Sequence, residues 1–249
     1  MAVRRKKSKT GISRLVEFAL RLAFQVVLGV ILLLITTIVL LRFYDPPVWS
    51  WKIQREFNAP ADYPEIALQK WVDLEMIAPS IQLAVVAAED QRFPYHFGID
   101  PDAIIEALEE ADRGKRLRGA STLTQQTAKN LFLWPNRDLA RKLFEMGIAL
   151  LLELVWDKHR ILEVYLNIAE FGPGVYGVAA ASEYWFQIPV DQLTNRQAAR
   201  LASVLPNPWR YRANPPSPYV AERSRWIEQQ MEQLGYTWIS PINSSFTPL

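Results

Sequence analysis

The sequence predicts a mainly α-helical domain that is preceded by one transmembrane helix. The first observation is a run of 20 residues, 22–41, without a charged side chain, because a helix of that length crosses the hydrocarbon core of a bilayer. The second is a set of later stretches that have the length and boundary residues of helices. The third is the scarcity of strand signals, since no stretch shows sustained two-residue alternation between turns.

The composition is that of one substantial domain plus the anchor. The chain has 249 residues, of which 50% are hydrophobic. Cysteine is absent, which excludes disulfides, thiolate metal sites and a cysteine nucleophile. The only histidines are His96 and His159, so a histidine-rich metal site is not expected.

Basic residues are concentrated before the apolar run. Residues 1–21 hold seven basic side chains and one acidic one, whereas the rest of the chain holds 21 basic and 25 acidic side chains, a formal charge of −4. This asymmetry predicts residues 1–21 as a cytoplasmic tail, 22–41 as the membrane helix and the remainder as extracytoplasmic. Because Arg42 and Pro46-Pro47 follow the run, with no cleavage site of small residues, we expect an uncleaved single-pass anchor. The acidic excess beyond the tail argues against a nucleic-acid partner.

The part after the anchor divides into a linker and a helical domain. Residues 42–75 are predicted as a linker and lead-in segment, and residues 76–249 as the domain. Its first helix follows Pro79-Ser80 and ends at Glu89. The charge-dense stretch 103–118 predicts a short helix followed by a mobile loop. Further helices are expected from about residue 121 and over about 139–156, 158–168, 194–204 and 220–234.

An acidic pair ends the first helix of the domain. The apolar run 83–88 is followed by Glu89 and Asp90, and the helix dipole disfavours negative charge at a C-terminus by roughly 0.3–1 kcal/mol. A sequence that breaks a local rule beside its core often marks a functional site. The alternative is a structural carboxylate that pairs with a nearby arginine, such as Arg92.

The next helix has a polar N-terminus. Thr122-Leu123-Thr124-Gln125 has the spacing of a capping box, so the helix should begin at Ser121 or Thr122. Thr122, Gln126 and Lys129 share one face, and Asn130 follows Gln126 by four residues. A helix N-terminus with hydroxyls and a lysine suits a phosphate or a sugar. An ordinary cap with a solvated polar face is the alternative.

Two later helices carry polar residues into apolar surroundings. Glu145 follows Arg141 by four residues, at the start of a helix that is otherwise nearly all apolar. A carboxylate at the edge of a core needs a partner or a task, and a simple surface ion pair is the alternative. Arg160, Glu163 and Asn167 share one face of the following helix, which a structural polar network would also explain.

Five segments, taken together and in order, resemble the peptidoglycan glycosyltransferases, glycosyltransferase family 51. They are Glu89-Asp90-x-x-Phe93-x-x-His96-x-Gly98, Gly119-x-Ser121-Thr122-Leu123-Thr124-Gln125-Gln126-x-x-Lys129-Asn130, Arg141-Lys142-x-x-Glu145, Arg160-Ile161-Leu162-Glu163-x-Tyr165-Leu166-Asn167 and Gln197-Ala198-Ala199-x-Leu201-Ala202. The resemblance covers about residues 75–215, and stretches 167–172 and 205–208 are similar to the monofunctional biosynthetic members. It departs at Gln197, where Glu is common, and at Trp185, where Tyr is usual. Too few residues follow 215 for a transpeptidase domain, so none is expected.

The resemblance implies a lysozyme-like helical fold with a small membrane-proximal lobe. Leu131-Phe132-Leu133-Trp134 is a candidate patch of that lobe, with ordinary core packing as the alternative. The implied reaction is inverting glycosyl transfer, in which the 4-hydroxyl of lipid II attacks the anomeric carbon of a growing glycan and undecaprenyl diphosphate leaves. The implied partners are lipid II, the growing strand and the bilayer, with other cell-wall synthesis proteins as candidates. The implied location is the bacterial inner membrane, with the domain in the periplasm or otherwise outside the cytoplasm. A divalent cation (Mg²⁺ or Mn²⁺) is expected from the resemblance, and no organic cofactor.

The resemblance also assigns roles. Glu89 would be the general base, Glu145 would serve the diphosphate side, and Asp90 would orient the first motif. The other substrate-binding candidates fall into three sets. The cations that would offset phosphate charge are Lys129, Arg141 and Lys142. The residues that would hold sugar and phosphate oxygens are Ser121, Thr122, Gln125, Gln126 and Asn130, and the polar residues of the fourth segment are Arg160, Glu163, Tyr165 and Asn167.

Two other classes of protein stay open at this point. A lysozyme-like hydrolase or lytic enzyme acting on finished peptidoglycan would also place carboxylates on a helical fold, but it has less need of three cations on the leaving-group side. A catalytically inactive, membrane-anchored binding protein would not need both Glu89 and Glu145.

Overall fold

The computed structural model describes residues 11–59, 63–65, 67–113, 121–136 and 138–244. The chain forms two compact units, Met1–Tyr44 and Asp45–Leu249. The first contains the predicted membrane anchor, and the second is the helical domain.

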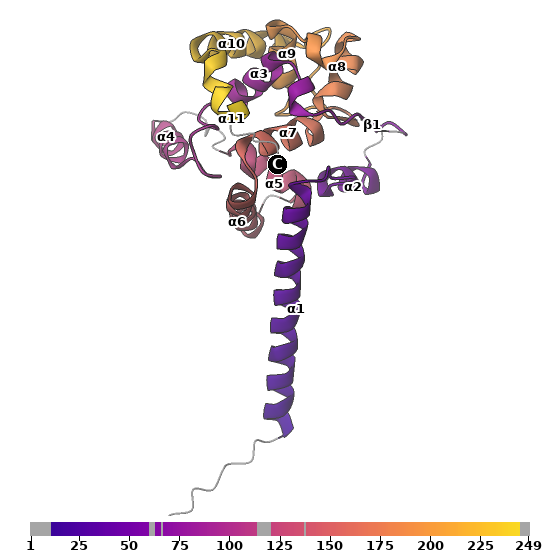
Figure 1. Cartoon of the computed structure of the whole chain (residues 1–249), viewed down its shortest axis with the longest axis vertical. Helices are drawn as coiled ribbons and strands as arrows, with labels where there is room; N and C mark the ends of the chain where they lie inside the picture. Colours follow the sequence, from indigo (N-terminus) through magenta and orange to yellow (C-terminus); the bar gives the residue numbers. More distant parts are fainter. Residues whose placement is uncertain (1–10, 60–62, 66, 114–120, 137, 245–249) are drawn as a thin grey trace, which may run out of the picture. The chain divides into compact units, whose positions relative to one another are not determined.

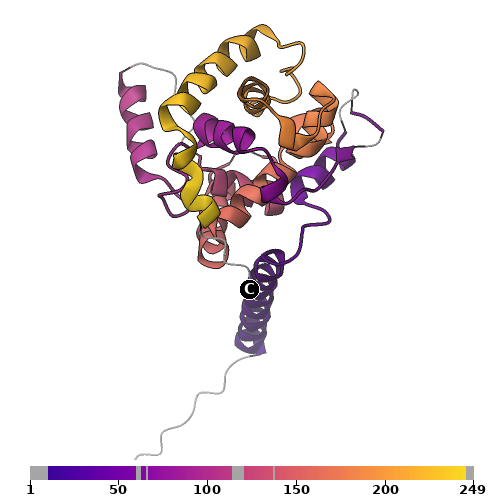
Figure 2. The ribbon, with the colours of Figure 1, turned by 45° about the horizontal axis from the view of Figure 1, so that its top comes forward.

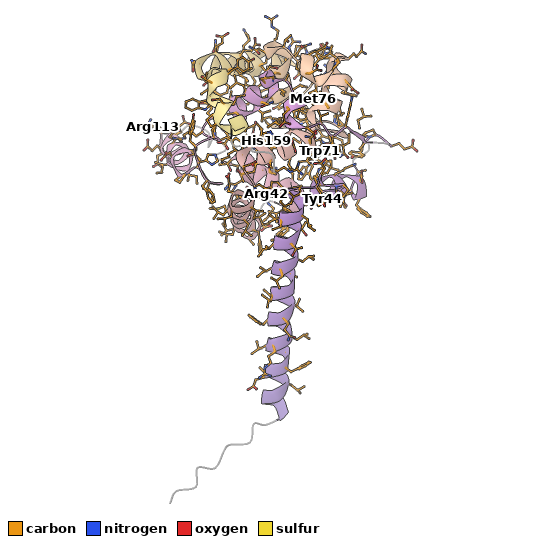
Figure 3. All side chains as sticks on the ribbon, in the orientation of Figure 1. Arg42, Tyr44, Trp71, Met76, Arg113 and His159 are labelled. Carbon is orange, nitrogen blue, oxygen red and sulfur yellow. The ribbon has the colours of Figure 1, made fainter. Side chains whose placement is uncertain are left out.

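The anchor is one long helix, α1 (Gly11–Leu41), whose side chains project outward along its length (Figure 3). Within the described residues, it is the one helix that is long and apolar enough to cross a membrane, over Leu15–Leu41. This finding is consistent with the predicted anchor, but the apolar helix starts earlier than residue 22 and includes Glu17 and Arg21. Long charged side chains near the end of a span can reach the interface, which explains how a helix extends beyond its uncharged part.

The core of the domain is built around α3 (Pro79–Glu89). This helix packs against α9 (Asn195–Val204) and α10 (Pro218–Leu234), as Figure 1 shows. Its residues from Ser80 to Ala87 are all buried, because the sequence there is almost continuously apolar. Proline occupies the first turn of α3 and α10, where its missing N–H costs no hydrogen bond.

A second group of helices supplies most of the predicted polar site. It consists of α5 (Leu123–Phe132), which packs against α6 (Leu139–Val155) and α7 (Lys158–Ile168). Asp138 and Asp157 cap α6 and α7 by accepting backbone N–H groups of the first turn. The helices that the sequence predicted after residue 120 are thus confirmed, with bounds within one or two residues for those whose ends were predicted.

The charge-dense stretch begins with α4 (Pro101–Asp112), which lies at one side of the domain (Figure 2). The predicted short helix is therefore confirmed. The loop that was predicted to follow it falls largely on residues 114–120, which lie outside the described residues.

Several short elements were missed by the sequence analysis. They are α2 (Ser50–Phe57), α8 (Val178–Phe186), α11 (Ser240–Ser244), the 3₁₀ turns Leu74–Met76, Val190–Gln192 and Tyr236–Ile239, and the strands β1 (Leu68–Gln69), β2 (Glu170–Gly172) and β3 (Val175–Tyr176). The strands form a sheet of order β1-β3-β2, in which β1 is parallel and β2 antiparallel to β3. Strands of two or three residues are too short to show an alternating pattern. Residues 42–75, predicted as a linker, contain α2 and β1.

A glycine-rich stretch, residues 171–177, joins β2, β3 and α8. Gly177 has φ of +79°, and a Cβ there would lie 2.7 Å from the carbonyl oxygen of Asn167. Both the left-handed backbone and the close approach therefore require glycine.

The patch predicted for a membrane-proximal lobe is corrected in part. Leu131 and Leu133 are buried in the core, so core packing, the alternative, holds for these two residues. Trp134 is 39% exposed and packs edge-to-face on the exposed ring of Phe144. The larger exposed apolar surface lies instead on α6, where Leu139, Leu143, Leu150 and Leu154 face outward.

Candidate active site

Glu89 lies at the last residue of α3 and is partly buried beside α5. Gln126 Nε2 donates a hydrogen bond of 2.9 Å to Glu89 Oε2, and the Tyr165 hydroxyl donates one of 3.1 Å to Gln126 Oε1. The amide of Gln126 is thereby held with its N–H group toward the carboxylate. Burial raises the pKa of Glu89, and the hydrogen bond from Gln126 offsets part of that rise.

The neighbouring Asp90 ties the first motif to the start of α5. Its carboxylate accepts the backbone N–H of Leu123 at 2.9 Å and contacts Nε2 of His96 at 2.9 Å. Arg92 pairs instead with Asp100, at 2.8 Å, and with residues of α4. Arg92 is therefore engaged by other carboxylates than Glu89, and the arginine whose charge acts on Glu89 is Arg223 of α10.

The predicted capping box at the start of α5 is confirmed. The Thr122 hydroxyl accepts the Gln125 N–H at 3.1 Å, and Gln125 Oε1 accepts the Thr122 N–H at 3.0 Å. The Thr122 hydroxyl also donates to the Gly98 carbonyl at 2.6 Å. Both side chains are buried, so their polar groups hold the loop and the helix together. Substrate contact by Thr122 and Gln125 stays a prediction.

Three cations and one carboxylate gather where α5 meets α6. Glu145 is buried, and its two oxygens accept Arg141 Nη1 at 2.6 Å and Lys142 Nζ at 2.5 Å. Lys142 also donates to the hydroxyl of Ser121, at 2.8 Å. Lys129 belongs to the same electrostatic group, because the carboxylates of Glu145 and Glu89 both act on its amine.

Lys129 differs from the other two cations in its immediate partners. Its Nζ lies 5.3 Å from the centroid of the Trp51 ring, and among the described residues no carboxylate lies within 4.0 Å of it. Burial lowers the pKa of Lys129, and the nearby Glu145 raises it in part. Asn130, the next residue, is buried on the same helix. Lys129 therefore adds a positive charge to the site beyond those of Arg141 and Lys142, the two cations that pair with Glu145.

A pocket of 390 Å³ opens beside Glu89. Its walls include Asp90 and Ser121, residues of α4 such as Glu106, and Trp226 and Gln230 of α10. The pocket is wide enough for a sugar ring and is lined by polar groups and one large aromatic side chain, a combination that suits a carbohydrate.

The polar residues of α7 fall into two sets. Tyr165 reaches the Glu89 network through Gln126. Asn167 instead binds both backbone groups of Val72, at 2.9 Å each, and Glu163 accepts the Leu74 N–H at 3.0 Å. Arg160 pairs with Glu163 and with Asp45, the latter at 3.0 Å. These three residues hold the segment before α3 in place, as the structural alternative proposed, and substrate contact by them stays a prediction.

The sequence analysis missed a second polar cluster, which contacts the first motif at Gly98. Glu153 of α6 accepts three donors at one oxygen: the Gly98 N–H at 3.0 Å, the Thr124 hydroxyl at 2.6 Å and Lys158 Nζ at 2.6 Å. The sequence signal that could have revealed this cluster is an isolated acidic residue, Glu153, in an apolar helix, the same pattern that drew attention to Glu145. His96 was quoted in the first motif but received no role, and the structure makes it the partner of Asp90.

Comparisons with known proteins agree with this arrangement. The family model described as Transglycosylase matches residues 61–232. Biosynthetic peptidoglycan transglycosylases of Shewanella oneidensis and Aeromonas hydrophila are 53% and 52% identical to this chain over 221 residues, which are 89% of this chain and 94% of each relative. One from Pectobacterium carotovorum is 48% identical over 232 residues, 92% of this chain and 95% of the relative. The resemblance inferred from the five motifs is confirmed, and the chain belongs to the transglycosylase family.

Proposed function

We propose that this protein polymerises lipid II into glycan strands of peptidoglycan by inverting glycosyl transfer, with release of undecaprenyl diphosphate. The observation that carries the proposal is that a carboxylate of raised pKa, Glu89, lines a pocket and interacts electrostatically with Lys129, one of a group of three cations. An alcohol acceptor needs a base, and a diphosphate leaving group needs positive charge. The site offers the base at the end of α3 and the positive charges on α5 and at the start of α6.

On the acceptor side, Glu89 would take the proton of the attacking 4-hydroxyl. The carboxylate borders the 390 Å³ pocket, so a sugar bound there can present its hydroxyl to Oε1, while Oε2 stays bonded to Gln126. As the new glycosidic bond forms between that oxygen and the anomeric carbon, the proton passes to Glu89. A base of raised pKa is better matched to a sugar hydroxyl than an ordinary glutamate.

On the donor side, the bond between the anomeric carbon and the diphosphate breaks, and its electron pair leaves with the diphosphate. Three cations and one carboxylate give the group a formal charge of +2. Preorganised cations stabilise the developing negative charge without reorganisation at the moment of reaction. Glu145 would act through Arg141 and Lys142, which it holds in place, because both of its oxygens are occupied by them.

The divalent cation implied by the resemblance is a separate proposal. The described residues offer no group of three or more carboxylate or imidazole side chains that could hold a metal ion, so they do not fit a metal bound by the protein alone. We propose that any divalent cation arrives with the diphosphate of the substrate, and we assign no step to it.

Synthesis is favoured over hydrolysis by the cations. A hydrolase of finished peptidoglycan releases a sugar hydroxyl, which leaves with a proton and carries no diphosphate charge, so that reaction has less need of three cations. We expect purified full-length protein to consume lipid II and release undecaprenyl diphosphate, and to leave finished peptidoglycan unchanged. Separate incubations with the two substrates, followed by chromatography of the products, check this. Breakdown of finished peptidoglycan with lipid II left intact would establish the hydrolase instead.

We also propose that α1 crosses the bacterial inner membrane once, with the basic tail in the cytoplasm and the domain in the periplasm. The outward apolar face of α6, with Leu139, Leu143 and Leu154, supports a contact of the domain with the bilayer that holds its lipid-linked substrate. Contacts with other cell-wall synthesis proteins stay a prediction.

The membrane topology predicts the behaviour of reporter fusions. Alkaline phosphatase, which is active only after export, should be active when it is fused after Leu249 and inactive when it is fused before Met1. The seven basic residues ahead of the apolar run set this orientation. An active N-terminal fusion combined with an inactive C-terminal one would reverse the assignment.

A further inference from the structure

The short helix α2 packs against the C-terminal end of α5, the helix that carries Lys129. The Ser50 hydroxyl and Gln54 Nε2 each donate a 2.8 Å hydrogen bond to the carbonyl of Leu133. Leu133 is the C-cap residue of α5, and the carbonyl groups at a helix C-terminus have no partner within the helix. The two bonds fix α2 against α5, and they place the ring of Trp51 next to the amine of Lys129, 5.3 Å from Nζ to the ring centroid.

The orientation of the Trp51 ring is itself fixed from the other side. Its Nε1–H donates to Oε2 of the buried Glu170 at 3.2 Å, and Arg55 contacts the same oxygen at 3.4 Å. The Arg55 guanidinium lies 4.9 Å from the centroid of the Trp51 ring. Glu170 also accepts Nε1–H of Trp209, at 3.0 Å. The indole therefore cannot rotate without breaking a bond to a buried carboxylate.

An aromatic ring attracts a cation without neutralising its charge or occupying its N–H groups as a carboxylate would. Arg141 and Lys142 are paired with Glu145, and much of their charge is offset there. Lys129 is held by a ring face instead, so its three N–H donors remain available to an anion that enters the site. Burial makes such an amine costly to keep charged, and the ring reduces that cost.

We propose that Trp51 is a positioning residue for Lys129, holding its charged amine ready for the diphosphate of the donor. Trp51 belongs to α2, the first helix of the domain, which begins eight residues after the end of α1, so this helix would form part of the donor site. The proposal rests on the proposed function, because it takes Lys129 as a ligand of the diphosphate.

The test measures binding of undecaprenyl diphosphate to the full-length protein in detergent. Trp51→Leu should raise the dissociation constant about fivefold, as expected for the loss of one partly buried cation–π contact. Trp51→Phe keeps a ring face but loses the N–H group, and it should restore most of the affinity. Trp209→Leu is the matched control, because Trp209 also donates its Nε1–H to Glu170, at the other carboxylate oxygen, but the ring that contacts Lys129 is that of Trp51. It should leave the dissociation constant unchanged.

Combining the variants separates positioning from a general structural role. In a Lys129→Ala background, Trp51→Leu should cause no further loss, since both changes act on one contact. Equal losses in Trp51→Leu and Trp209→Leu, or an undiminished loss in the Lys129→Ala background, would overturn the inference. Partial unfolding of a variant lowers the fraction of protein that binds undecaprenyl diphosphate, but it does not change the dissociation constant of the folded fraction. If Trp51→Leu does not fold at all, Trp51→Met is measured in its place.

The two proposals fail in different ways. If Lys129→Ala weakens binding but Trp51→Leu does not, only the role of Trp51 is wrong. If Lys129→Ala itself leaves the dissociation constant unchanged, the diphosphate site of the proposed function is wrong, and the role of Trp51 falls with it.

Discussion

Glu89→Gln is expected to lower the rate of lipid II polymerisation by about 10²–10⁴-fold, the usual contribution of a positioned general base. The substitution keeps the size of the side chain and its hydrogen bond, because the new amide oxygen can accept from Gln126 Nε2, as Glu89 Oε2 does now at 2.9 Å. What it removes is the ability to accept the proton of the acceptor hydroxyl. The measurement is the initial rate of polymerisation of lipid II by the full-length protein.

The same variant should be at least as stable as the parent at neutral pH. Burial raises the pKa of Glu89 in the folded protein, so above that pKa the charged carboxylate disfavours the folded state. This penalty disappears as the pH falls below the pKa of the unfolded chain. A glutamine carries no charge at any pH and avoids the penalty. A low rate together with an undiminished melting temperature would identify Glu89 as a catalytic group.

The raised pKa also fixes the sign of the pH dependence. The base is active only when it is ionised, so kcat/KM should fall as the pH drops through the pKa of Glu89. That acidic limb should lie above the range of an ordinary glutamate, about 4.3. A near-normal rate of Glu89→Gln would instead make Glu89 a structural acid and would reject the proposed base.

The sequence was a good guide to the long helices. The apolar run before Glu89 and the helix at residues 158–168 were predicted because each combines an apolar pattern with clear boundary residues. The helix α2 was missed because its eight residues follow a Pro-Pro pair and hold only a mixed pattern. Its stability comes from long-range bonds to Leu133, which no local signal reveals.

The site was predictable as a set of motifs and less so as a set of contacts. The spacing of Thr122 and Gln125 indicated a capping box, and the structure shows that this cap uses their polar groups. Gln126 lies one residue further on, and it alone of these three reaches Glu89. The role of Glu153 depends on three donors from distant segments. Partners that converge through folding cannot be read from spacing within one helix.

The second large effect is expected for Lys129→Ala, which should weaken binding of the diphosphate-bearing donor about tenfold or more. The loss of one charge-assisted hydrogen bond typically costs roughly 1.5–3 kcal/mol, and each 1.4 kcal/mol corresponds to about tenfold in affinity. Arg141→Ala should also weaken donor binding, but it would leave Glu145 with Lys142 as its single partner and so disturb the site. Lys129→Ala leaves both bonds of Glu145 in place, which makes it the cleaner probe. The dissociation constant for undecaprenyl diphosphate is the quantity to measure.

Two basic residues outside the site serve as controls. Lys70 pairs with Glu183 at the surface, where both side chains are more than half exposed, and Arg113 pairs with Glu109 in the same way. Arg113 lies at the end of α4, at the edge of the domain (Figure 3). Exposed pairs of this kind contribute little, so Lys70→Ala and Arg113→Ala should leave the affinity nearly unchanged. If either control weakened binding as much as Lys129→Ala, the effect would be one of net charge, which added salt would screen. A loss in Lys129→Ala that neither control shows, and that persists in salt, would place the diphosphate at the partly buried amine of Lys129, on which both Glu89 and Glu145 act.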